Sequence, residues 1–336
     1  MLREKIEKYL LDVQKPSRYI GGEVGSIIKD KSEIEVRFAF CFPDTYDIGM
    51  SHLGMKILYS LTNERKNYWC ERCFAPSEDF EKIMRENDIP LYALESLDPI
   101  RDFDFIGFTM QYELSYTNVL NMLDLAGIPI YSRDRTEELT QIVVAGGPCV
   151  CNPEPLADFF DLFILGEGEE VNLELMDLYN KMKKQGASRK DFLREACKIE
   201  GIYVPEFYKF DYKTDVTIEK LEIVNNAPEI VKKRIIKDFD KVYYPENFVV
   251  PFTEIVHDRV SVEVLRGCLR GCRFCQAGFI YRPFREKKAD TIVNQTRCLC
   301  ENTGYDEVSL ASLSTSDHSE ITPILSELIE YTADEK

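Results

Sequence analysis

The sequence predicts an α/β protein whose first domain is a doubly wound parallel sheet. Three observations predict this class. Short runs of β-branched and aromatic residues alternate along the chain with longer segments of helical periodicity. Glycine-bearing loops follow several of the apolar runs, as expected at the carboxyl ends of parallel strands. The 336 residues, 44% of them hydrophobic, are enough for about two globular domains.

Residues 31–186 show the strongest alternation and are the expected α/β domain, preceded by a helical extension at 1–30. The helix at 113–126 is expected to stop at Gly127, because glycine readily ends a helix. The expected strands are 34–40, 91–94, 104–109, 142–145 and 162–165, and the expected helices are 53–63, 79–86, 113–126 and 170–184.

The rest of the chain divides into a bridge and a second domain. Residues 187–250 are expected to form a β-rich bridge, because short β-prone runs at 216–221 and 231–236 alternate with charges and turns. Residues 251–336 begin a second domain of two strand–helix repeats. Its expected elements are strands at 251–265 and 307–311, and helices at 289–301 and about 320–331.

Charge and composition limit the class of protein. No signal-like leader and no run of about 18 apolar residues is present, so we expect a cytoplasmic protein without a membrane span. The net charge of −17 argues against a nucleic-acid-binding surface spread over the whole molecule. Between Arg259 and Lys288, however, eight basic residues accompany two acidic ones. This stretch is either an electropositive pocket for an anionic cofactor or substrate, or a solvated basic loop.

Three cysteines stand at close spacing directly after the apolar run 260–265. They are Cys268, Cys272 and Cys275, in the pattern C-x3-C-x2-C. Three thiolates suit a 4Fe-4S cluster and leave one iron open to a ligand. A structural zinc site needs four ligands, and the chain has only three histidines, so zinc is the weaker reading.

The other cysteines suggest no site. Cys70 and Cys73 have redox-pair spacing but lack the strand-then-helix context of such sites, so we expect them to be incidental. The remaining closely spaced cysteines are expected to be small buried hydrophobic residues: Cys149, Cys151, Cys298 and Cys300.

The cysteine pattern, with Phe274 before the third cysteine, resembles the cluster motif of the radical S-adenosylmethionine (SAM) superfamily. The resemblance implies that the three cysteines hold the cluster, that SAM binds the open iron, and that Phe274 lies near the adenine. It also implies a 5'-deoxyadenosyl radical that abstracts a substrate hydrogen, and an electron donor such as flavodoxin or ferredoxin. Ser312 and Ser314, after the second strand of the barrel, are candidates for holding the SAM amino group.

Three N-terminal motifs, at 43–54, Gly146-Gly147-Pro148 and Gly166-Glu167-Gly168-Glu169, resemble the cobalamin-binding-type domain that precedes the barrel in one large radical SAM class. The chain is similar to a largely uncharacterised bacterial family of that class. This resemblance implies a cobalamin-like site at Ser51, Gly146, Gly147, Gly166 and Gly168. The D-x-H-x-x-G pattern of a cobalamin-coordinating histidine is absent around His52, so coordination by this residue is not expected. The domain either binds cobalamin or only contacts the barrel or the substrate.

The length of the chain bears on its activity. A complete eight-fold barrel needs on the order of 250 residues, whereas only about 75 follow Ser261. We therefore expect the N-terminal part of a longer radical SAM enzyme with an incomplete (β/α) barrel, inactive by itself. A non-catalytic iron–sulfur redox sensor or interaction protein is the alternative. The substrate is not predicted; RNA or a ribosomal component is compatible with the basic stretch.

Overall fold

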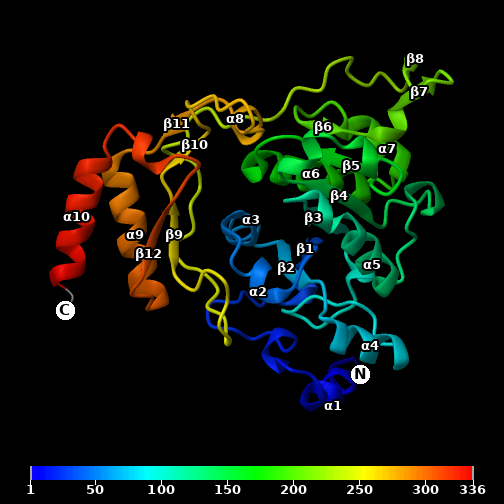
Figure 1. Cartoon of the computed structure of the whole chain (residues 1–336). Coiled ribbons are helices and arrows are strands. Elements are labelled where there is room, and N and C mark those ends of the chain that lie inside the picture. Colours follow the sequence, from blue (N-terminus) through cyan, green and yellow to red (C-terminus); the bar gives the residue numbers. More distant parts are fainter. Residues whose placement is uncertain (1, 335–336) are drawn as a thin grey trace.

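A six-stranded sheet forms the centre of the first part of the protein in the computed structural model, which describes residues 2–334 (Figure 1). The strand order is β2-β1-β3-β4-β5-β6. All neighbours are parallel except β5 and β6. The strands are β1 (Val36–Phe42), β2 (Tyr68–Phe74), β3 (Phe105–Thr109), β4 (Ile142–Gly146), β5 (Leu162–Ile164) and β6 (Ile202–Tyr203).

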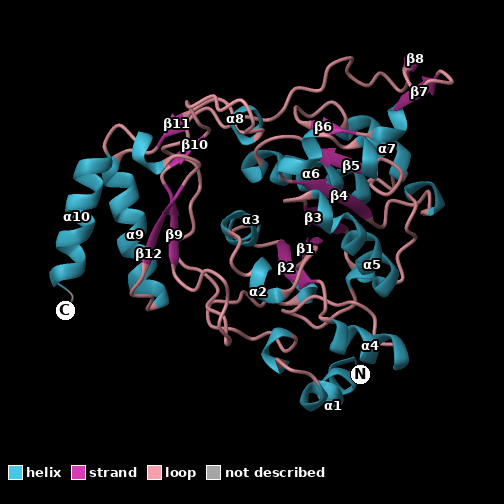
Figure 2. Cartoon of the chain, in the orientation of Figure 1, coloured by secondary structure: helices cyan, strands magenta, loops and turns pink. Residues whose placement is uncertain are grey.

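Helices cover both faces of this sheet (Figure 2). On one face α3 packs against α6. On the other, Arg85 of α4 contacts Asn121 and Asp124 of α5. Parallel strands covered on both faces are almost wholly buried, which explains the continuous apolar runs of the sequence. The helices of this part are α1 (Leu2–Tyr9), α2 (Tyr46–Gly49), α3 (Leu53–Asn63), α4 (Glu78–Glu86), α5 (Tyr116–Ala126), α6 (Gly168–Lys184) and α7 (Arg189–Ala196).

The second part of the protein is smaller and has its own apolar core. Strand β9 (Val260–Glu263) pairs in parallel with β12 (Val308–Ala311), and β10 (Leu265–Arg266) pairs antiparallel with β11 (Arg285–Glu286). Helices α9 (Ala289–Thr303) and α10 (Ile321–Asp334) lie against each other, and α9 lies against β9. The short helix α8 (Ala277–Ile280) precedes β11. Val260, Val262, Ile292 and Ile324 are completely or almost completely buried in this core.

The segment between the two parts contains an antiparallel hairpin of β7 (Tyr208–Tyr212) and β8 (Ile218–Ile223), which projects from the body of the protein (Figure 1). Its second strand is mostly exposed. Residues 231–236, expected to be β-prone, pair only through one isolated bridge between Arg234 and Gly166.

These observations confirm the predicted α/β fold with a mainly parallel sheet. Two of the expected strands are wrong. Residues 91–94 form only an isolated bridge through Tyr92, and of the expected strand 251–265 only its last part, from Val260, is extended and paired. The expected domain limits stay a prediction, and their outer ends at residues 1, 335 and 336 lie outside the described residues.

Strand β2, at the edge of the central sheet, was not expected. Strand β2 contains Glu71 and Arg72, which interrupt the apolar pattern although both are buried. Arg72 donates to Glu23 at 2.8 Å and to Glu95 at 2.6 Å, so its charge is neutralised by residues distant in sequence. Cys70 and Cys73 also lie on β2 and are buried. Their odd spacing directs them to opposite faces of the strand, which argues against a redox pair.

Across residues 2–334, no helix combines the length and the apolar character needed to pass through a membrane.

The buried carboxylate of Asp161, directly before β5, contacts β4 and two buried arginines. The Asp161 side chain accepts a hydrogen bond from the Val143 amide at 2.7 Å and from the Arg135 guanidinium at 2.8 Å, and it also contacts Arg189. All three charged residues are buried.

Replacing Asp161 by alanine should lower the free energy of unfolding by about 3–5 kcal/mol, because two buried guanidinium groups lose their shared counter-ion. Chemical denaturation monitored by circular dichroism measures this change. The matched control is Asp158→Ala, at an exposed position three residues away, which should change stability by less than about 0.5 kcal/mol. Equal effects of the two substitutions would contradict this account.

Candidate functional site

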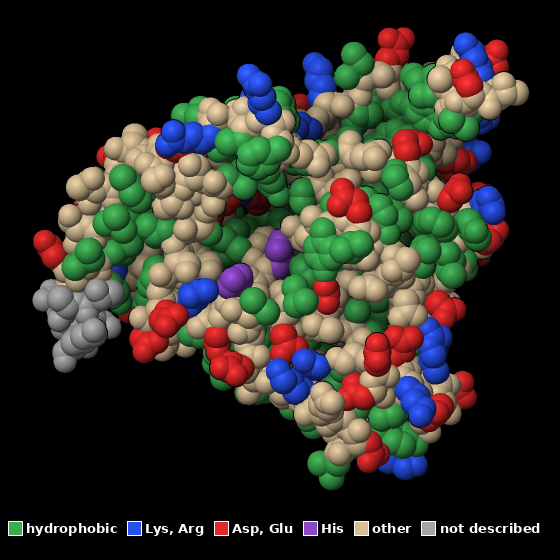
Figure 3. All heavy atoms as spheres, viewed as in Figure 1, with side chains coloured by type: hydrophobic (Ala, Val, Ile, Leu, Met, Phe, Trp, Pro, Cys, Tyr) green, Lys and Arg blue, Asp and Glu red, His purple; other side chains and the backbone are tan. Residues whose placement is uncertain are grey.

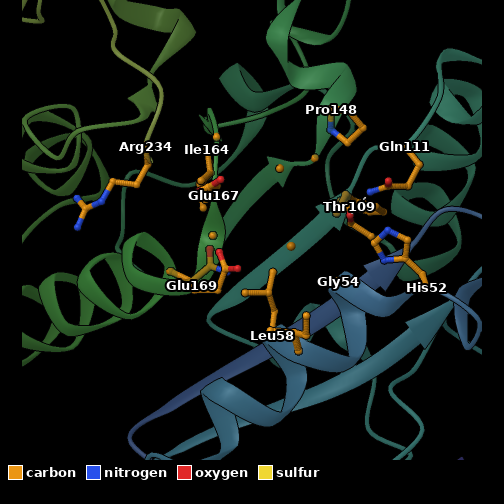
Figure 4. Close-up of a pocket in the computed structure, with 18 of the residues that line it drawn as sticks. His52, Gly54, Leu58, Thr109, Gln111, Pro148, Ile164, Glu167, Glu169 and Arg234 are labelled. Carbon is orange, nitrogen blue, oxygen red and sulfur yellow. Dashed lines mark hydrogen bonds between the residues drawn. The ribbon is translucent and has the colours of Figure 1, made fainter. Parts of the chain in front are cut away.

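A cavity of about 310 Å³ lies at the carboxyl ends of the parallel strands (Figure 4). In sheets with the order 2-1-3-4-5 the connections leave in opposite directions from β1 and β3, and ligands bind in the crevice that opens there. Residues from the ends of β1, β3, β4 and β5, and from the start of α3, line the cavity, together with Arg266 and Tyr281 of the second part. The surface is hollowed between the two parts of the protein (Figure 3).

All four glycines of the expected cobalamin-like site line this cavity. At Gly147 (φ +101°) a Cβ atom would lie 2.6 Å from the Met110 carbonyl oxygen, and at Gly166 (φ +104°) it would lie 2.2 Å from the Arg234 carbonyl oxygen. Only glycine fits both the conformation and the space at these two positions. The glycines therefore let two pairs of backbone segments meet tightly at the wall of the cavity.

Ser51, the fifth residue expected in this site, lies elsewhere. It is not among the described residues that line the cavity. Its hydroxyl donates to the Asp47 carbonyl at 2.8 Å and accepts from the His257 amide at 3.0 Å. Ser51 thus joins the loop after β1 to the segment that leads into β9.

The neighbouring His52 does line the cavity, beside Gln111 and Thr109 (Figure 4). It caps the start of α3, where its Nδ1 atom accepts a hydrogen bond from the Met55 amide at 3.1 Å. Burial lowers the pKa of His52 to about 4, against a hydrogen bond with Gln111 that favours the charged form. The imidazole is therefore neutral at pH 7. This cap could not be predicted from the sequence, because histidine is not a usual N-cap residue.

Charged groups gather at the side of the cavity that faces the second part. Arg266 contacts Glu169 and Glu263, each at 2.8 Å, and Glu167 at 3.3 Å. Arg285 donates to Glu167 at 2.9 Å. Arg270, further along the chain, is paired with Asp317. These carboxylates offset part of the positive charge between Arg259 and Lys288.

The three expected metal ligands lie on one loop. Cys268 and Cys275 are half-buried and Cys272 is exposed. The Cys275 amide donates to the Cys272 carbonyl at 3.1 Å, and the Arg270 amide lies 3.5 Å from the Cys268 sulfur. No three His, Cys, Asp or Glu side chains in residues 2–334 are gathered as metal ligands. All three thiols are free, and they come from eight consecutive residues.

The residues expected near SAM are placed around the same loop. Phe274 is 93% exposed. The Ser312 hydroxyl lies 2.7 Å from that of Thr315, and the Ser314 hydroxyl donates to Asp317 at 2.6 Å. Because Asp317 also pairs with Arg270, the loop after β12 is fastened to the cysteine loop.

Four cysteines expected to be buried are not. Cys149, Cys298 and Cys300 are half-buried, and Cys151 is exposed and lines the cavity. The prediction was wrong because it rested on the usual burial of free cysteine, whereas Cys149 and Cys151 follow the glycine turn at the rim of the cavity.

The fold and the site together define an α/β domain with a cavity at its strand ends, joined to a second, cysteine-bearing part. Residues 54–205 match the family described as radical SAM proteins, N-terminal. The match lies largely within the α/β domain, and the expected resemblance to radical SAM proteins is confirmed.

One relative aligns with most of the chain. The chain is 28% identical, over 290 residues, to the uncharacterized protein MJ0966 of Methanocaldococcus jannaschii. The match covers 85% of this chain and 51% of the relative, so the chain spans about half of the length of that protein.

Two solved structures share the fold. The first is the radical SAM methyltransferase TsrM from Kitasatospora setae with cobalamin and a [4Fe-4S] cluster bound, at a TM-score of 0.50 and 11% identity over 89% of this chain and 51% of that one. The second is the cobalamin-dependent SAM radical enzyme OxsB with aqua-cobalamin bound, at a TM-score of 0.52 and 15% identity over 88% of this chain and 37% of that one. At these identities the likeness establishes the fold.

His52 should make the protein sensitive to acid. Between pH 6.5 and 4 the unfolded state binds a proton at this histidine and the folded state does not, so stability falls as the pH is lowered through this range. Asparagine caps a helix as well but does not titrate. His52→Asn should therefore match the wild type at pH 7 and be more stable by about 2 kcal/mol at pH 4.5.

Denaturation curves at both pH values measure this difference, and His257→Asn, at an exposed histidine, is the matched control. An unchanged difference between wild type and His52→Asn at the two pH values would contradict a neutral, buried His52.

Proposed function

We propose that this chain is the N-terminal part of a radical SAM enzyme, which holds a 4Fe-4S cluster on Cys268, Cys272 and Cys275 and binds cobalamin at the cavity of the α/β domain. One observation carries the proposal. The cysteine loop is bounded at both ends by residues that line the cavity, Arg266 before it and Tyr281 after it. Cluster site and cavity are therefore neighbours.

The cysteines fit a cluster by their chemistry. Thiolates are the usual ligands of iron–sulfur clusters, and three of them leave one iron for another ligand. The thiols are free and reach the surface, and Gly267 and Gly271 have positive φ angles that allow the loop a tight path. When bound, the cluster and SAM supply one-electron chemistry that yields a 5'-deoxyadenosyl radical. The residues of the chain would hold the cluster, orient SAM and exclude water.

The cavity fits part of a cobalamin molecule. Its volume of about 310 Å³ is at the lower end of the range for small-molecule sites, about 300–1,000 Å³. The glycine turns make backbone the main component of one wall, which permits close approach of a bulky ligand. Because Nδ1 of His52 already accepts the helix-capping hydrogen bond, this histidine acts in positioning the wall, and we assign it no role in coordinating cobalt.

The activity of the whole protein extends this proposal. An electron donor such as flavodoxin or ferredoxin would reduce the cluster, and the residues beyond the first strand–helix units of the barrel would complete the SAM and substrate sites. RNA or a ribosomal component stays a candidate substrate. Phe274, Ser312 and Ser314 are proposed to contact SAM when the barrel is complete.

Anaerobic reconstitution with iron and sulfide tests the cluster. The wild-type chain should bind about four iron and four sulfide ions and give the EPR signal of a reduced 4Fe-4S cluster. Cys272→Ala should lose most of this iron and the signal, because two thiolates remain. Cys298→Ala, at a half-buried cysteine of α9, is the matched control and should bind as much iron as the wild type.

Failure of the wild type to form the cluster, or full retention of the cluster by Cys272→Ala, would contradict the proposal. A cluster that forms in the full-length protein without reductive cleavage of SAM would support the iron–sulfur sensor instead.

A further inference from the structure

An ion-pair network joins the loop after β5 to the two strands that flank the cysteine loop. We call this network the interdomain clamp; it consists of Glu167, Glu169, Glu263, Arg266 and Arg285. Glu167 and Glu169 belong to the α/β domain, whereas the other three belong to the second part. The side chains of the clamp are between 9% and 18% exposed, so water screens these pairs only weakly.

The two arginines of the clamp would repel each other without its carboxylates. Arg266 and Arg285 stand directly opposite each other on the antiparallel strands β10 and β11. Like charges in this position repel, and both guanidinium groups also lie over the Phe239 ring, at 4.9 and 5.6 Å from its centre. Glu167 contacts both arginines and is the carboxylate that they share, whereas Glu169 and Glu263 pair with Arg266 alone.

Hydrogen bonds with the backbone of residues 234–236 hold Glu167 in place. Its backbone amide donates to the Arg234 carbonyl at 3.0 Å, and its side chain accepts from the Ile236 amide at 2.5 Å. The Arg234 amide donates in turn to the Leu165 carbonyl at 2.8 Å. With Gly166 pressed against the Arg234 backbone, the carboxylate has little freedom to follow the arginines if they move.

The same residues connect the cavity with the thiols. Glu167, Glu169, Glu263 and Arg266 all line the cavity, so a ligand there would touch the clamp directly. Arg266 lies two residues before Cys268. Arg285 lies at the end of the segment that contains all three cysteines. The position of the cysteine loop over the cavity thus depends on two arginines whose partners form the wall of the cavity.

We propose that Glu167 and Glu169 are positioning residues that hold the cysteine loop over the cavity through Arg266 and Arg285, and so couple a ligand in the cavity to the metal centre. The coupling to a metal centre rests on the proposed function, because it requires the cluster on the three cysteines. The clamp itself does not require it and exists in the metal-free protein.

The first arm of the test uses hydrogen exchange of the metal-free protein. Glu167→Gln keeps the shape of the side chain but removes its charge. Backbone amides at 264–287 should exchange at least about ten-fold faster in this variant, while β2 (68–74) exchanges at the wild-type rate and shows that the fold is intact. Glu170→Gln is the matched control, because Glu170 pairs with Arg234 of the bridge and touches neither strand of the cysteine loop.

A double substitution separates the clamp from a general loss of stability. If Glu167 acts through Arg285, the variant Glu167→Gln/Arg285→Gln should exchange no faster at 264–287 than Glu167→Gln alone. Rates in the double variant that equal the product of the two single effects would assign the two residues independent roles and overturn the clamp.

The second arm uses the reconstituted protein. The reduction potential of the cluster should become more positive in Glu167→Gln than in the wild type and in Glu170→Gln, because a negative charge beside two arginines is lost. A wild type without a cluster refutes the proposed function, and hydrogen exchange still decides on the clamp. A wild type with a cluster, together with exchange rates and a potential unchanged in Glu167→Gln, refutes the clamp and leaves the proposed function standing.

Discussion

The contact of Arg266 and Arg285 with Glu167 is the interaction on which the arrangement of the two parts depends. Without it, Arg285 would lose its carboxylate partner and face Arg266 across a two-residue strand pair, while Arg266 would keep Glu169 and Glu263. The strand pair β10–β11 is too short to be stable through its backbone hydrogen bonds alone. The α/β domain therefore supplies, through Glu167 and Glu169, charge that fixes the strands on either side of the cysteine loop.

The cavity depends on the topology of the sheet in a comparable way. Because the chain leaves β1 and β3 in opposite directions, a crevice opens between them, and the glycine turns after β4 and β5 complete its wall with backbone. The neutral His52 closes the first turn of α3 at this place. The cavity, the helix cap at His52 and the interdomain clamp are thus built at the ends of adjacent strands. Some of their residues lie more than 200 positions apart in the sequence.

The sequence was sufficient to predict those features that depend on local pattern. The parallel strands at 104–109 and 142–145, the helix 53–63 and the glycine turns could all be inferred, because apolar period and turn chemistry are local properties. Features that depend on remote partners could not. Strand β2 was missed because the charge of Arg72 is neutralised by Glu23 and Glu95. The sequence left the environment of the basic stretch around the cysteine loop open for the same reason, since carboxylates that pair with it come from the α/β domain and from the loop after β12.

The central claim is that the cavity and the cysteine loop form one site. The most direct test is the Mössbauer spectrum of the reconstituted chain, enriched in the Mössbauer-active isotope of iron and recorded with and without hydroxocobalamin at saturating concentration. A cavity ligand that contacts Glu167 and Arg266 should change the spectrum of the cluster iron. Identical spectra, with both the cluster and cobalamin shown to be bound, would contradict the claim.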